Sequence, residues 1–300
     1  MWVGAAFLSA LLLGFYDVAK KRSLGGNAVI PVLLLNTLFS TLLFLPIILS
    51  TELGLEWFNG TTFESRTGSI DEHIFVVIKS LITLSSWLCG YYAIKHLPLT
   101  IVGPVNATRP VVVLLGATLL FGERLNIWQW GGVLLTIVSL YLLSRASSKE
   151  NINFKQSRHV WALFAAMLLG AVSGLYDKYI ISSAGLDPCF VQSWFSVYQL
   201  VMMCIIAAVI WLPKHQNERF EWRWSIPLIS VFVCCADFAY YHALDIEGSM
   251  IAVVSMIRRS SVIVTFLCGA LLFGERNLRH KAVDLALILV GMVLLAIGSV

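Results

Sequence analysis

The chain has 300 residues, of which 58% are hydrophobic and only 13% are charged, and its mean hydropathy is +0.83. This composition excludes an ordinary soluble domain, and apolar runs of roughly 20 residues that follow one another almost end to end predict a polytopic membrane protein. The net charge of +4 is small, and no basic domain is present that would support nucleic-acid binding.

Ten apolar runs of membrane-spanning length can be counted along the chain. No basic residue precedes the first run and no small-residue cleavage site follows it, so we expect it to remain as a helix. The predicted fold class is an all-α polytopic membrane protein. The expected helices are Trp2–Ala19, Val29–Leu49, Ile74–Ile94, Leu99–Leu120, Ile127–Leu143, Val160–Ile181, Phe190–Leu212, Ile226–Leu244, Ser249–Leu272 and Lys281–Gly298.

A motif occurs twice. The sequence Leu-Leu-Phe-Gly-Glu-Arg at residues 119–124 recurs 152 residues later, at residues 271–276. In both copies an apolar run ends in the motif and another follows, so the glycine can end a helix and the Glu-Arg pair supplies polar groups for a turn at the membrane surface. A repeat of this length predicts a fold that is built twice.

Other segments extend the repeat. Tyr16 and Asp17 match Tyr176 and Asp177, and on a second alignment Arg109 falls on Arg259. The expected domains are a first repeat at 1–144, a polar linker at 145–159 and a second repeat at 160–300. Each repeat holds five spans, an odd number, so the second copy must cross the membrane in the opposite sense. Inverted repeats of this kind place a binding site between them, near mid-membrane.

Two five-helix repeats, each ending in an apolar helix, Gly-Glu-Arg and a last helix, resemble the EamA type of the drug/metabolite transporter superfamily. The first repeat departs from the common pattern, with Leu13-Gly14 where Trp-Gly is usual. The resemblance implies a ten-helix secondary transporter with a central cavity. It implies no particular substrate, because members of the family carry amino acids, amines, sugars, nucleotide sugars and phosphorylated metabolites.

Four basic residues, Lys79, Arg109, Arg258 and Arg259, lie deep in the expected spans. A basic residue at a helix centre costs roughly 2.5–3.5 kcal/mol on insertion scales, so several together need partners or a wet cavity. An internal salt bridge, for instance from Arg258 to Asp237 or Glu247, is the alternative. Superfamily relatives that carry sugar phosphates use basic residues on the fourth and ninth helices, so the resemblance implies a substrate-binding role for these arginines.

Further candidates for substrate binding follow helical spacing. Asn106 shares a face with Arg109, next to a kink expected at Pro110, and polar or aromatic stripes run along the third and seventh helices. Each stripe either lines a cavity or joins helices by hydrogen bonds. The candidates beyond the basic residues are Asn106, Tyr16, Trp87, Tyr91, Gln192, Gln199 and Tyr240.

Acidic residues within the spans are candidates for proton coupling. Asp17 and Asp237 could carry protons. The alternative is that Asp17 pairs with Lys20 or Lys21. For Asp177 we favour pairing with Lys178 or a neighbouring helix.

Motifs of enzymes and metal sites are absent, so we expect no catalytic residue, metal or cofactor, and no enzymatic activity. The six cysteines are interpreted as small buried hydrophobic residues. Three functions remain open: a secondary transporter of an anionic metabolite, an exporter of amines or other cations that uses Asp17, Asp237 and aromatic rings, and a non-transporting membrane scaffold or sensor.

The expected partners are a small-molecule substrate, the lipid bilayer, and a coupling proton or counter-substrate, for a monomer or weak dimer in a bacterial inner membrane. Loop Lys and Arg residues number fourteen on one side of the membrane and three on the other. The positive-inside rule then predicts that both termini and the acidic loop 51–72 lie outside. Eukaryotic relatives are generally drawn with cytosolic termini, and we follow the charge count.

Overall fold

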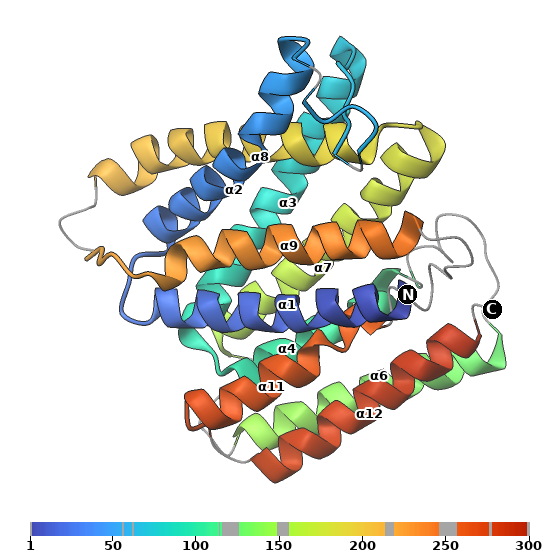
Figure 1. Ribbon diagram of the computed structural model, residues 1–300. Helices are drawn as coiled ribbons and strands as arrows, with labels where there is room; N and C mark the ends of the chain where they lie inside the picture. The colour runs from blue at the N-terminus through green and yellow to red at the C-terminus, as the bar shows by residue number, and fades with distance from the viewer. Residues whose placement is uncertain are drawn as a thin grey trace.

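The protein is described from a computed structural model that covers residues 2–55, 57–61, 63–113, 115, 126–148, 156–213, 219–245, 257–275 and 278–298. All regular structure in these ranges is helical, and ten helices form two sets of five (Figure 1). The first set is α1 (Trp2–Leu24), α2 (Val29–Glu52), α3 (Ile70–His96), α4 (Leu99–Ala107) and α6 (Ile127–Ser148). The second set is α7 (Arg158–Lys178), α8 (Pro188–Ile206), α9 (Ser225–Asp245), α11 (Ser261–Leu272) and α12 (Leu278–Ile297).

Seven helices of the described chain are long and apolar enough to cross a membrane, and two shorter apolar helices cover Leu99–Val113 and Ser225–Tyr240. The predicted fold class, an all-α membrane protein with two sets of five helices, is confirmed. The seven long spans are Val3–Leu24, Val29–Glu52, Ile70–His96, Ile127–Arg145, Arg158–Ile181, Pro188–Trp211 and Leu278–Ile297.

Helix boundaries differ from the expected spans where polar residues continue a helix. The third helix begins at Ile70 because Ser69 and Glu72 form a capping box, in which each side chain satisfies a backbone N–H of the other residue. The sixth and seventh spans end in short π-helical turns, η1 (Tyr179–Ser183) and η2 (Ala207–Trp211). Such turns leave no trace in the hydrophobic pattern.

The cysteines are free, as expected, but Cys204 and Cys235 are exposed on the helix surface and the other four are half-buried. The interpretation that they are buried is therefore wrong. An apolar side chain on a membrane protein can face lipid, because lipid tails are as apolar as a protein core.

The second copy of the doubled motif ends α11 and caps α4. Gly274 has a φ of +60°, which ends the helix as expected for the glycine. The carboxylate of Glu275 accepts hydrogen bonds from the backbone N–H groups of Leu99 (2.6 Å) and Thr100 (2.8 Å), at the start of α4. The motif therefore ties one repeat to the other. The first copy, residues 119–124, lies outside the described residues.

Helices of the first set pack mainly on helices of the second set. The pair α1 and α9 has its counterpart in α7 and α3, and the pair α2 and α9 has its counterpart in α8 and α3. In three further pairs the two helices are each other's counterparts, so the two-fold relation maps each pair onto itself. These pairs are α2 with α8, α4 with α11 and α6 with α12. In addition, α1 begins and α12 ends on the same side of the molecule (Figure 1). This pattern has the two-fold character expected of two related repeats.

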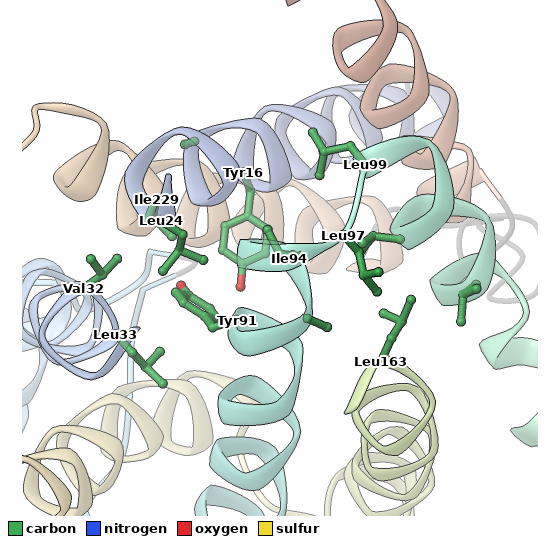
Figure 2. Close-up of a cluster of buried hydrophobic side chains, with 14 of the residues drawn as sticks. Tyr16, Leu24, Val32, Leu33, Tyr91, Ile94, Leu97, Leu99, Leu163 and Ile229 are labelled. Atoms are coloured by element: carbon green, nitrogen blue, oxygen red, sulfur yellow. The ribbon is translucent and has the colours of Figure 1, made fainter. Parts of the chain in front are cut away.

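The main apolar core draws on both repeats. Tyr16 of α1 and Tyr91 of α3 lie in the same buried cluster as Leu163 of α7 and Ile229 of α9 (Figure 2). Each set of helices therefore completes its core with side chains of the other set.

Candidate functional site

Three arginines from the two repeats come within electrostatic range of one another. Arg109 follows a break at Thr108, where α4 ends before Pro110, as the expected kink requires. Arg258 and Arg259 lie just before α11. The charge of Arg258 acts on Arg109, and the charges of Arg109 and Arg258 both act on Arg259. The three guanidinium groups therefore repel one another. Like charges that repel one another favour an anion between them.

Arg109 reaches α7 through a gap left by a glycine. A Cβ atom added at Gly170 would lie 2.5 Å from Cζ of Arg109, so the guanidinium is packed flat on that helix. The Nε atom of Arg109 is buried and has no hydrogen-bond partner. A buried donor without a partner is costly, and such a group is commonly a site where a ligand or water binds.

Arg258 has a carboxylate partner. Its guanidinium contacts Asp237 of α9, as one of the expected alternatives proposed, and lies 4.3 Å above the ring of Tyr240. Within the part of the chain that the structure describes, neither Arg109 nor Arg259 forms a salt bridge. The cluster therefore holds three guanidinium groups and one paired acid, and the charge of Asp17 also acts on Arg109.

Asp17 forms an ion pair with the ammonium group of Lys20. The Nζ atom of Lys20 is 2.6 Å from the Asp17 carboxylate, 3.9 Å from the ring centre of Tyr16 and 5.5 Å from that of Tyr91. The alternative that Asp17 pairs with Lys20 is confirmed. Thr265 of α11 donates a hydrogen bond to the other carboxylate oxygen of Asp17, at 3.3 Å.

The two predicted stripes meet at a small polar cavity. Trp87 of α3, Gln192 and Gln199 of α8, Ser40 of α2 and Asp237 of α9 surround a space of about 20 Å³. This volume is about that of one water molecule. The buried Ser40 hydroxyl and the Gln199 amide nitrogen have no hydrogen-bond partner. Asp237 lines this cavity and also holds Arg258, so the cavity adjoins the arginine cluster.

Lys79 is not part of the arginine cluster and instead pairs with an acid of α7. Its Nζ atom is 2.8 Å from Asp177 of α7 and 5.0 Å from the ring centre of Phe195 of α8. Thr83, one turn on, hydrogen-bonds Ser173 of α7. The favoured alternative, that Asp177 pairs with a neighbouring helix, is confirmed. Lys79 therefore joins α3 to α7.

Asn106 is half-buried, and its backbone oxygen accepts a hydrogen bond from the N–H of Thr108 at the end of α4. Sequence reasoning missed Gly170 and Thr265 as parts of the site. The signal for Gly170 would have been a small residue on α7 opposite a long basic one, but this requires knowing which helices touch.

Residues 1–145 match the EamA-like transporter family. The chain is 35% identical over 129 residues to an uncharacterized transporter of Pseudomonas aeruginosa, which covers 42% of this chain and 39% of that protein. It is 25% identical over 142 residues to an uncharacterized transporter of Archaeoglobus fulgidus, which covers 47% of each. The chain thus spans less than half the length of these two relatives.

A crystal structure of another protein has the same fold, with a TM-score of 0.62 at 15% identity over 97% of this chain and 96% of that one. The fold match covers both repeats, and the family match points to a transporter rather than an enzyme. The resemblance seen in the sequence is confirmed for the first repeat: residues 1–145 match the EamA-like transporter family, and both relatives that match part of the chain are transporters.

Proposed function

We propose that this membrane protein is a secondary transporter of a small anionic metabolite, a carboxylate or a phosphorylated compound, which binds between the two repeats. The observation that carries the proposal is the pair of guanidinium groups, Arg109 and Arg259, that form no salt bridge among the described residues. The planar fork of arginine binds carboxylate and phosphate oxygens in pairs, so an anion would both neutralise and orient these groups.

The position of the arginines suits alternating access. Arg109 belongs to the first repeat and Arg259 to the second, so an anion bound to both would hold the repeats together. Its release would remove that link. Rocking of one repeat against the other around a fixed site is the usual mechanism of transporters built from inverted repeats.

The ion pair of Arg258 and Asp237 offers a route to coupling. An anionic substrate competes with Asp237 for Arg258, and a carboxylate that loses its guanidinium partner binds a proton more readily. Asp237 is therefore our candidate for a coupling proton.

The contacts of the acids weigh against a cationic substrate. Asp17 already holds Lys20, whose ammonium lies over Tyr16. Asp237 already holds Arg258, whose guanidinium lies over Tyr240. Within the described residues, the acid and the aromatic ring at Asp17 and at Asp237 are thus each occupied by a cation of the chain itself.

Proteoliposomes provide the test. Uptake of radiolabelled carboxylates and phosphorylated metabolites should be lost in Arg109→Met and in Arg259→Met, whereas Arg145→Met, which removes an exposed arginine of α6, should transport normally. Arg259→Lys keeps the charge but loses the fork, so uptake should weaken substantially without loss of folding. Normal transport by both methionine variants would end the anion proposal and favour the cationic one. Absence of saturable uptake of any solute would favour a scaffold.

We also propose that the protein lies in a bacterial inner membrane. From the count of loop Lys and Arg residues, we propose that both termini lie outside the cell membrane. A tag at either terminus should be labelled in intact cells. If labelling requires permeabilisation, the termini lie inside and the proposed orientation is wrong.

A further inference from the structure

A cavity of about 680 Å³ lies between α1 and α9, and none of the residues that line it belongs to the arginine cluster. Its polar part is formed by Arg22, near the end of α1, and by Arg223, Trp224 and Ser225, at the start of α9. Because α1 ends where α9 begins, these groups share one end of the helix pair. Arg22 is exposed and forms no ion pair within the described ranges, and Trp224 is 80% exposed.

The wall of the cavity is apolar. Phe15 of α1 and Phe232 of α9 pack with their ring centres 5.9 Å apart, and Leu228 lies one turn before Phe232 and is 44% exposed. Phe15, Val18 and Arg22 follow one another at helical spacing on a single face of α1. The transport-site residues of α1 lie on a different face. The cavity is thus a groove with a basic polar end and an apolar length that faces the bilayer.

The side chains of the groove differ from those at the equivalent place in the other repeat. Its two-fold counterpart lies between the end of α7 and the start of α3. There the ring of Tyr179 packs on Phe75 with centres 6.2 Å apart, and the first turn of α3 carries Asp71 and Glu72. The counterpart therefore carries two acids, of which Glu72 is paired with Arg66, where the groove of α1 and α9 carries two arginines.

We propose that the groove between α1 and α9 binds one anionic phospholipid, with the phosphate at Arg22 and Arg223 and an acyl chain along Phe15, Leu228 and Phe232. Two arginines beside an interfacial tryptophan match the charge and depth of a lipid headgroup, and the apolar wall matches its tail. The groove lies on the side of the membrane that carries most of the loop Lys and Arg residues.

Arg223 is only partly available in the unliganded groove. One of its nitrogens donates to the backbone oxygen of Arg22 at 2.7 Å, and another lies 3.4 Å from the carboxylate of Glu221. The Glu221 side chain is 64% exposed, and its carboxylate competes with a lipid phosphate for the same guanidinium. Removal of this acid should therefore strengthen lipid binding, which gives the test a variant of opposite sign.

Native mass spectrometry of the purified full chain, titrated with phosphatidylglycerol or phosphatidylcholine, measures the binding. The wild type should retain phosphatidylglycerol preferentially. Arg22→Gln combined with Arg223→Gln should bind it about thirty-fold more weakly, and Glu221→Gln should bind it more tightly. Arg145→Gln combined with Arg158→Gln removes two exposed arginines outside the groove and should leave binding unchanged.

Leu228→Trp keeps both arginines but places a larger side chain in the apolar part of the groove. It therefore distinguishes the binding of a lipid from the binding of a free anion. It should also lose phosphatidylglycerol. Equal binding of the two lipids by the wild type, or equal loss in both arginine pairs, would overturn the proposal. Displacement of the lipid by glycerol 3-phosphate at the same concentration would overturn it too, because the groove would then select a free phosphate.

Discussion

Replacement of Gly170 by alanine tests the arginine cluster without removing any charge. The new methyl group would lie 2.5 Å from Cζ of Arg109, 2.6 Å from one terminal nitrogen and 2.9 Å from the other. Carbon atoms approach to about 3.5 Å at best, so the guanidinium must move by roughly 1 Å. The guanidinium ends a flexible side chain, and we expect it to move rather than α7.

The two consequences have opposite signs. A movement of this size breaks at least one charge-assisted hydrogen bond to a bound anion, which is worth about 1.5–3 kcal/mol, so the apparent affinity should fall by roughly 10- to 150-fold. The helix itself should gain, because alanine in a helix interior is favoured over glycine by roughly 0.5–1 kcal/mol. The variant should therefore be as stable as the wild type, or more so, and transport poorly.

Gly174→Ala is the matched control, since it lies one turn further along α7 and a methyl group there meets nothing within 4 Å. Concentration-dependent uptake in proteoliposomes and thermal unfolding should be measured for both variants. Gly174→Ala should keep the wild-type affinity. If Gly170→Ala keeps it too, Arg109 does not bind the substrate in the position described here.

Two further predictions concern stability. Glu275→Gln weakens the cap on α4, so the melting temperature should fall with a loss of roughly 0.5–1 kcal/mol, and the amides of Leu99 and Thr100 should exchange hydrogen faster; unchanged exchange would show that the cap contributes nothing. Lys79→Met leaves Asp177 without its partner and should cost about 1–3 kcal/mol in thermal unfolding, most of which Lys79→Met with Asp177→Asn should recover; equal losses in the single and double variants would contradict the ion pair.

The sequence was sufficient for the fold because hydrophobic length and a repeated motif are strong, local signals. Ten helices in two sets of five follow from runs of about 20 apolar residues and from the doubled Phe-Gly-Glu motif. The ion pairs of Asp17 with Lys20 and of Arg258 with Asp237 were among the stated alternatives, because these partners lie close in sequence or in consecutive spans.

Contacts between distant segments could not be predicted in this way. Glu275 was expected to serve a local turn, yet it caps a helix that begins 176 residues earlier. Likewise, nothing local indicates that Gly170 makes room for Arg109. Hydrophobic periodicity tells which face of a helix is polar but not which helix lies opposite, and the site is made of such pairings.

The interleaving of the two helix sets has a consequence for biosynthesis. Helix α1 packs most closely on α9, whose first residue is translated about 200 residues after α1 ends. At a synthesis rate of 5–20 residues per second, α1 waits roughly 10–40 s for this neighbour. Lys79 likewise enters the bilayer about 100 residues before Asp177, so for several seconds its charge has no acid from α7 beside it. During translation, insertion must therefore precede packing, and the nascent first half needs either a snorkelling lysine or the shelter of the insertion machinery until the second half arrives.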